Sequence, residues 1–278
     1  MRSENKLKRV LAIILLASVP FASAEAVAAI DFSHVFADRD ACFLMVDLKT
    51  GHTVAEHNPQ RCKERFSPCS SYKIAAAVMG FDNGVIKDEN QVVKWDGIKR
   101  DRPELNQDQT PLTWMKESVK WVTEWVMAKL GEKNIQKYLD GFSYGNKDFS
   151  EGLKDAWVIS SLKISAQEQV AFLSKLWKDE LPVSKRSMEL TRKIIFVKSL
   201  KNNFELYGKT GTGCLVGHDC MDRPDKMLGW FVGAVKAGSQ TYIFAANASD
   251  LKPQGPPGGP RVRKTVIEIL EQMELASK

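Results

Sequence analysis

Long hydrophobic runs are almost absent from this chain of 278 residues. Only 10–19 forms an extended apolar stretch, and no later stretch approaches the roughly 18 apolar residues that a membrane-spanning helix needs. The run at 10–19 follows four basic residues within 2–9 and precedes Ala22-Ser23-Ala24, a small-x-small cleavage pattern. We expect 1–24 to be a signal peptide cut after Ala24, which would send 25–278 to the periplasm without membrane attachment. An uncleaved N-terminal anchor is the alternative.

Charge of one sign does not accumulate either. The chain has 40 Lys and Arg against 34 Asp and Glu, a formal net charge of +6, and its basic residues are interspersed with acidic ones. Such a distribution gives no basic stripe for a nucleic acid, so we expect no nucleic-acid partner. No internal repeat or low-complexity linker divides 25–278, which we expect to form a single domain. The sequence leaves open whether that domain is a monomer or a homodimer.

Histidine is scarce, and none of the four histidines stands in a His-x-His or His-Glu-x-x-His pattern that would place two imidazoles on a zinc ion. The four are His34, His52, His57 and His218. His218, with Cys214, Asp219 and Cys220, would be a passable zinc set, but an exported chain favours a disulfide between the two cysteines. We therefore expect no metal.

Five cysteines are enough for two disulfides and one free thiol. Cys42 and Cys62 flank an expected hairpin of two strands, 42–48 and from Thr53 onward, so roughly equal arms would bring them together. Cys214 and Cys220 bracket a short loop and are expected to form the second bridge. Cys69 remains, with no histidine placed to activate it, and we expect it to be a buried thiol.

Hydrophobic periodicity predicts an α+β fold. We expect an antiparallel β-sheet flanked by N- and C-terminal helices, with a central, mainly helical lobe inserted. An apolar, alanine-rich helix at 73–81 should be buried, and one starting at Pro111 should stop at Gly131. Ser165 and Glu168 form a capping box for another helix. That helix is expected at 165–177. We expect further helices at 188–195 and 262–275 and strands at 204–208, 227–235 and 241–246.

Ser70-Ser71-Tyr72-Lys73 carries the first sign of chemistry. A serine hydroxyl needs a base within hydrogen-bond reach, and positions i and i+3 of a helix share one face, so Lys73 lies beside Ser70. The helix N-terminus favours a developing oxyanion there. Ser-x-x-Lys alone also fits a capped helix with a solvated lysine. A Lys209-Thr210-Gly211 sequence far downstream makes acyl transfer the better interpretation, because the two motifs together mark penicillin-recognising serine enzymes.

Four further features extend the pattern over most of 25–278. Ser118 and Val119 precede Tyr144-Gly145-Asn146, and Trp157 follows before Lys-Thr-Gly, with Gly-Trp-Phe-x-Gly after it at 229–233. In this order the chain resembles the class D (OXA-type) serine β-lactamases. The resemblance implies the fold described above and hydrolysis of the β-lactam amide of penicillins, oxacillin-type compounds among them.

The resemblance also implies roles in the reaction. Ser70 would be the acylated nucleophile and Lys73 the general base, carrying a carbamate formed from carbon dioxide. Carbon dioxide reacts only with a neutral amine, and burial lowers a lysine pKa toward neutrality. Trp157 would donate its indole N–H to the carbamate, and Ser118 would relay a proton to the leaving nitrogen.

Substrate contacts follow from the same resemblance. The strand at Lys209-Thr210-Gly211 would line the site, with Lys209 and Thr210 binding the substrate carboxylate. The backbone N–H groups of Ser70 and Thr212 would form the oxyanion hole.

Three positions carry open alternatives. The carboxylate-binding arginine of the family fits Arg263 best and Arg261 less well, and either could instead be a surface charge. Tyr144 could contact substrate or pack beneath the site. Lys120 stands where the family has an apolar residue, and it could hold the carbamate, disturb the pocket of the buried lysine or turn outward.

Two other functions share parts of the pattern. A penicillin-binding sensor would acylate without rapid deacylation and would need a membrane anchor. A cell-wall transpeptidase or carboxypeptidase usually has Ser-x-Asn in place of Ser118-Val119-Lys120, and it lacks Tyr-Gly-Asn.

Overall fold

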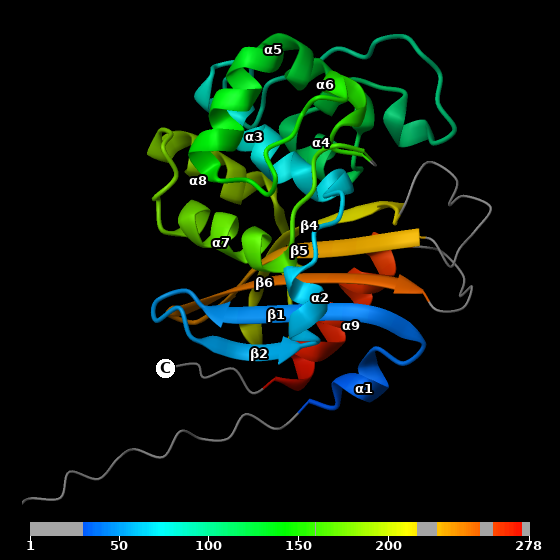
Figure 1. Ribbon diagram of the computed structural model, residues 1–278. Helices are drawn as coiled ribbons and strands as arrows, with labels where there is room; N and C mark the ends of the chain where they lie inside the picture. The colour runs from blue at the N-terminus through cyan, green and yellow to red at the C-terminus, as the bar shows by residue number, and fades with distance from the viewer. Residues whose placement is uncertain (1–29, 159, 216–226, 251–257, 274–278) are drawn as a thin grey trace, which may run out of the picture.

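A six-stranded antiparallel sheet forms the base of the molecule, and a helical lobe lies on one of its faces (Figure 1). The computed structural model describes residues 30–158, 160–215, 227–250 and 258–273. The strand order is β2-β1-β6-β5-β4-β3, so the first and last parts of the chain meet where β1 pairs with β6. The strands are β1 (Arg39–Asp47), β2 (Thr53–His57), β3 (Phe196–Ser199), β4 (Glu205–Cys214), β5 (Met227–Ala237) and β6 (Gln240–Asp250).

Helices cover both faces of the sheet, which confirms the predicted α+β class. Adjacent residues of β5 alternate between two cores: Trp230 belongs to the core beneath the lobe, and Phe231 to the core beneath the C-terminal helix. The helices are α1 (Phe32–Val35), α2 (Pro59–Lys63), α3 (Lys73–Asp82), α4 (Pro111–Lys116), α5 (Lys120–Phe142), α6 (Gly152–Asp155), α7 (Ala166–Trp177), α8 (Lys185–Ile194) and α9 (Gly259–Gln272). Within the described ranges, none of them has the length and apolar character needed to cross a membrane.

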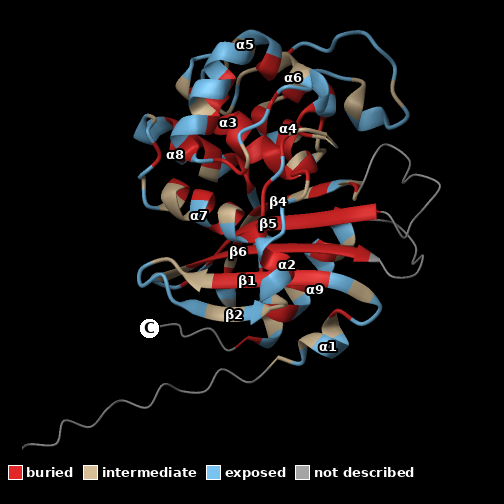
Figure 2. Cartoon of the chain, viewed as in Figure 1, coloured by how far each residue is buried: buried red, intermediate tan, exposed pale blue. Residues whose placement is uncertain are grey.

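The centre of the lobe is α3, the alanine-rich helix predicted from the sequence. Every residue from Lys73 to Phe81 is buried, and Figure 2 shows this helix enclosed by its neighbours. Gly80 lets neighbouring segments pack closely against α3, since a Cβ there would lie 3.2 Å from side-chain atoms of Ile86 and Val126. Because α3 is buried on every side, the rest of the lobe packs around it.

The predicted N-terminal hairpin is present as β1 and β2, paired antiparallel. Cys42 of β1 is bonded to Cys62, with the two Cα atoms 5.3 Å apart, as predicted. Cys62 lies on α2, one turn beyond the return strand, so the bridge fastens α2 to the sheet. Cys69 is a buried free thiol. Cys220, in the second predicted bridge, lies outside the described residues, as does the signal peptide.

The prediction of one helix from Pro111 to Gly131 is wrong in two places. The chain leaves α4 after Lys116 and starts α5 at Lys120, because Ser118 adopts a left-handed conformation (φ 57°) that no α-helix accommodates. Gly131 (φ 73°, ψ 156°) interrupts α5 without ending it, and helical backbone resumes as far as Phe142. Ser118 therefore lies in a bend between helices and not on a helix.

Candidate active site

Ser70 lies in a short 3-10 turn, Cys69–Tyr72, that leads directly into α3. Lys73 is the first residue of α3, and its Nζ donates a hydrogen bond of 3.2 Å to Ser70 Oγ. Ser70 is partly exposed, whereas the whole of Lys73 is buried. The hydroxyl can thus reach a ligand in solvent while its basic partner is shielded behind it.

The surroundings of Lys73 disfavour a charged ammonium. Burial is the main cause that holds the pKa of Lys73 well below its ordinary value, and the positive charges of Lys209 and Lys120 lower it further. No carboxylate forms an ion pair with the Lys73 amine among the described residues. A neutral amine can take a proton from a hydroxyl, and it can also react with carbon dioxide.

Trp157 packs against the side chain of Lys73. Its ring centroid lies 4.9 Å from Lys73 Nζ, and its side chain is almost completely buried. The indole N–H donates to the Leu153 carbonyl at 3.4 Å, a long hydrogen bond. In this arrangement the face of the ring, and not the N–H, is turned to the amine.

The Lys-Thr-Gly sequence lies on β4, which runs past the serine turn at close range. A Cβ on Gly211 would lie 2.8 Å from the Pro68 carbonyl oxygen and 3.2 Å from Ser71 N, so only glycine permits this approach. Thr212 follows, and its hydroxyl accepts a hydrogen bond of 2.9 Å from Gly259 N at the start of α9. This contact ties β4 to the N-terminal end of α9.

Lys209 lies on β4 and is buried, with Nζ donating to the Thr210 carbonyl at 3.0 Å and to its hydroxyl at 3.3 Å. Burial lowers the pKa of Lys209 to about 7, and the charges of Arg263 and Arg102 act in the same direction. A cavity of about 310 Å³ opens beside it, lined by Lys209, Thr210, Arg263 and Lys116 and by apolar side chains. None of the described residues that line this cavity is acidic.

The two candidate arginines at the start of α9 face different parts of the molecule. Arg263 lines the cavity next to Lys209 and is close enough to depress the pKa of that lysine. Arg261 instead borders a separate, small cavity with Arg39 and Met227. Of the two, Arg263 is the one that shares a cavity with the Lys-Thr-Gly strand.

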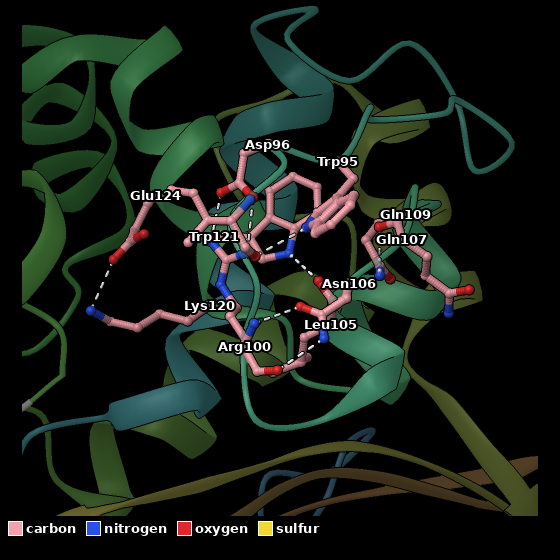
Figure 3. A network of polar contacts seen from close by, with 11 residues as sticks. Trp95, Asp96, Arg100, Leu105, Asn106, Gln107, Gln109, Lys120, Trp121 and Glu124 are labelled. Atoms are coloured by element: carbon pink, nitrogen blue, oxygen red, sulfur yellow. Dashed lines mark hydrogen bonds and ion pairs between the residues drawn. The ribbon is translucent and has the colours of Figure 1, made fainter.

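Ser118 and Lys120 lie at the junction of α4 and α5. Ser118 is half-buried. Lys120 is turned toward solvent, where Nζ lies 2.9 Å from Glu124 and 3.9 Å from Asp155 (Figure 3). The outward orientation is one of the three alternatives left open by the sequence. Its positive charge still lowers the pKa of Lys73.

The Tyr144-Gly145-Asn146 sequence forms a structural clamp beneath the site. Tyr144 is 1% exposed and packs edge-on against Tyr72 of the serine turn. A Cβ on Gly145 would stand 2.0 Å from the Lys163 carbonyl oxygen, and Asn146 Oδ1 accepts from Lys163 N at 2.9 Å. The geometry favours packing over substrate contact for Tyr144.

Sequence reasoning missed Arg102 and Lys116. Arg102 acts electrostatically on Lys209, and Lys116 lines the cavity beside it. Both lie in or next to a polar segment that the sequence predicts to be turns. A charged residue in such a segment is usually exposed to solvent, so the sequence does not indicate that these two act on Lys209 or its cavity.

Metal ligands do not gather in the part of the chain that the structure describes, where no three His, Cys, Asp or Glu side chains are grouped for a metal ion. His218 and Cys220, from the zinc alternative, lie outside the described residues.

Comparisons with known proteins agree with this geometry. The family model "Penicillin binding protein transpeptidase domain" matches residues 41–270. β-Lactamase OXA-1 of Escherichia coli is 34% identical over 272 residues, which cover 94% of this chain and 96% of the relative. The probable β-lactamase YbxI of Bacillus subtilis is 34% identical over 240 residues, covering 86% and 83%.

Solved structures give the same result. A class D β-lactamase from Bacillus subtilis superposes with a TM-score of 0.79 at 32% identity, covering 91% of this chain and 99% of that one. FUS-1 (OXA-85), a class D β-lactamase from Fusobacterium nucleatum subsp. polymorphum, gives 0.74 at 28% identity, with 84% and 92% covered. With motifs, fold and relatives in agreement over most of its length, the chain belongs to the class D β-lactamases and is a β-lactamase hydrolase.

Proposed function

We propose that this enzyme opens the β-lactam amide of penicillins through an acyl-enzyme on Ser70, with Lys73 as the general base. The observation that carries the proposal is the 3.2 Å contact between Lys73 Nζ and Ser70 Oγ, made by a lysine that is completely buried. A buried amine with a lowered pKa is available as a base at neutral pH, which a solvated lysine is not.

Acylation begins when Ser70 loses its proton toward Lys73 and its oxygen attacks the lactam carbonyl. The carbonyl oxygen becomes negative and accepts hydrogen bonds from the backbone N–H groups of Ser70 and Thr212. The close packing of Gly211 on the serine turn supports this pair of donors. Ser118 then relays this proton from Lys73 to the lactam nitrogen as the C–N bond breaks, which restores the Ser118 hydroxyl and the basic form of Lys73.

The surroundings of Lys73 support its reaction with carbon dioxide, because the amine is buried, its pKa is lowered and it lies against Trp157. Bound to Nζ as a carbamate, it would supply a carboxylate-like base. Trp157 would stabilise this state by turning its N–H from the long contact with Leu153 toward Lys73. Lys73 would then accept protons in both half-reactions, first from Ser70 and later from the water that hydrolyses the ester.

The substrate carboxylate would bind where Lys209, Thr210 and Arg263 meet. Since the pKa of Lys209 is about 7, its amine is only partly charged without substrate, and a bound carboxylate would favour the protonated form. Binding of the anion and uptake of a proton by Lys209 are therefore coupled. Tyr144 would support the serine turn through packing.

We also propose export to the periplasm after cleavage behind Ala24. The leader pattern supports it, and so does the Cys42–Cys62 bridge, because such bonds persist in oxidising compartments. Penicillins of the oxacillin type are the first substrates to examine.

Turnover of a chromogenic β-lactam by the purified chain tests the proposal. We expect sustained turnover, complete loss in Ser70→Ala, and a covalent adduct on the Ser70 peptide when a slow substrate is trapped for mass spectrometry. A single stoichiometric burst without further hydrolysis would support a penicillin-binding sensor or transpeptidase-like protein. Undiminished turnover in Ser70→Ala would rule out the acyl-enzyme.

A further inference from the structure

Ser118 depends on its surroundings for its conformation. Its backbone lies in the left-handed region (φ 57°), between the end of α4 and the start of α5. A residue other than glycine stays there only when neighbouring contacts hold it. The relevant contacts come from residues 95–109, a segment that contains none of the catalytic motifs and that we call the brace segment.

The brace segment holds the residue before Ser118. Arg102 donates a hydrogen bond of 2.7 Å from its guanidinium to the carbonyl oxygen of Glu117, which caps the C-terminal end of α4. A positive side chain at this end also complements the partial negative charge of the exposed carbonyl groups. The contact fixes the direction of the peptide that enters the bend.

The same segment holds the residues after Ser118. Trp121, in the first turn of α5, donates from its indole N–H to the Leu105 carbonyl at 3.0 Å. The guanidinium of Arg100 lies over the Trp121 ring, 5.6 Å from its centroid, and Figure 3 shows this group of contacts from close by. The brace segment therefore forms hydrogen bonds to the chain both before and after the bend at Ser118.

Internal contacts make the brace segment rigid enough for this role. Asn106 accepts from Arg100 N at 2.7 Å and donates back to the Arg100 carbonyl at 2.9 Å. Asp96 forms an ion pair with Arg100, and Asp108 accepts from Trp95 N at 2.9 Å. These internal hydrogen bonds and the ion pair restrict the conformations that the loop can adopt.

We propose that the brace segment positions Ser118 for proton transfer to the leaving nitrogen, with Arg102 and Trp121 as its positioning residues. The inference rests on the proposed function of Ser118. It goes beyond that function by assigning the position of Ser118 to two side chains. Arg102 caps the C-terminal end of α4, and Trp121 lies in the first turn of α5. The bend lies near the reaction centre. Lys120, two residues after Ser118, has its Nζ 3.9 Å from Asp155, and Trp157, two residues after Asp155, has its ring centroid 4.9 Å from Lys73 Nζ.

A double-mutant cycle on the acylation rate separates positioning from general stability. Arg102→Ala should slow acylation on the order of 10-fold, since small displacements of a reacting group cost large factors in rate. Trp121→Phe keeps a ring but loses the N–H, and we expect a smaller loss in the same direction. In a Ser118→Ala background each change should cost less than about twofold further, because the group that it positions is already absent.

A matched control is available at Arg186. This exposed arginine also donates to a backbone carbonyl, that of Lys87 at 3.1 Å, but lies on α8 and outside the described lining of the Lys209 cavity. Arg186→Ala should leave the acylation rate unchanged. The charge of Arg102 also acts on Lys209 and would alter KM, so the uncharged Trp121→Phe variant isolates the positional effect.

Several outcomes would overturn the inference, each with folding checked by thermal unfolding. One is that each substitution lowers the acylation rate by the same factor in the wild-type and Ser118→Ala backgrounds. Another is that folded Arg102→Ala and Trp121→Phe proteins acylate as fast as the wild type. A third is that Ser118→Ala itself leaves the acylation rate unchanged. A wild-type chain that forms no acyl-enzyme at all would instead refute the proposed function. Should Arg102→Ala fail to fold, the test is made with Trp121→Phe alone, by comparing its effect on the acylation rate in the wild-type and Ser118→Ala backgrounds.

Discussion

Gly211 of β4 lies against the Pro68 carbonyl, so close that a Cβ on Gly211 would stand 2.8 Å from that oxygen. Pro68 immediately precedes the 3-10 turn that carries Ser70. The strand that supplies Lys209 and Thr212 and the turn that supplies the nucleophile are thus in direct backbone contact. Their separation depends on the missing side chain of one residue.

Gly211→Ala should therefore damage catalysis more than folding. The added methyl must push β4 away from the serine turn and widen the oxyanion hole, and we expect kcat to fall on the order of 100-fold. Steady-state kinetics and thermal unfolding measure the two effects. Gly141→Ala is the control, because its Cβ would meet only the Pro182 ring, at 3.1 Å. Unchanged kcat in Gly211→Ala would refute the assigned role of this contact.

Substrate binding should weaken as the pH rises through about 7. Lys209 is protonated below its pKa of about 7 and neutral above it, so the free enzyme loses a positive charge in this window. For a β-lactam whose carboxylate stays ionised, KM should increase between pH 6.5 and 8.5, values chosen to bracket that pKa. A KM that is flat over this range, with kcat measured in parallel, would contradict the coupling of Lys209 to the carboxylate.

Arg263→Ala and Arg261→Ala should behave differently. Arg263 shares the Lys209 cavity, and loss of a charged hydrogen bond to the substrate carboxylate should raise KM about 10-fold. The pKa of Lys209 should also rise, because one of the causes that lower it is removed, and the pH dependence of KM should move to higher pH. Arg261→Ala should leave both unchanged. A larger effect of Arg261→Ala would reverse the assignment.

Removal of the Cys42–Cys62 bridge should lower the free energy of unfolding by about 2–4 kcal/mol. The paired Cys42→Ser, Cys62→Ser variant and the oxidised wild type can be compared in urea. Cys69 offers an internal control: burial raises the pKa of its thiol to about 12, so native protein should not be alkylated there. Alkylation of Cys42 and Cys62 in unreduced protein would show that the bridge is absent.

The sequence predicted those parts of the fold that local patterns determine. The β1–β2 hairpin follows from the apolar run at 42–48 and the return strand expected from Thr53 onward. Helix α7 begins where the Ser165–Glu168 capping box places it, with both reciprocal hydrogen bonds present. The uniform apolar run from Lys73 indicated a buried helix, which is the centre of the lobe. Each of these signals lies within a few residues along the chain.

Tertiary contacts decided what the sequence could not predict. The bend at Ser118 is fixed by Arg102, 15 positions before the carbonyl that it binds, and periodicity across the bend looked continuous. The short strand β3 pairs with β4 at the edge of the sheet and carries too few residues for a pattern. The choice of Arg263 over Arg261 depended on which cavity each one lines.

The carbamate on Lys73 is the centre of the account, and carbon-13 NMR of the enzyme in labelled bicarbonate tests it most directly. We predict a carbamate signal in the wild type that is absent from Lys73→Ala and weakened in Trp157→Ala, with activity rising as bicarbonate is added. Loss of the wild-type signal and of activity together at mildly acid pH should follow. No carbamate signal in active wild-type enzyme, with rates indifferent to bicarbonate, would show that Lys73 acts as a free amine.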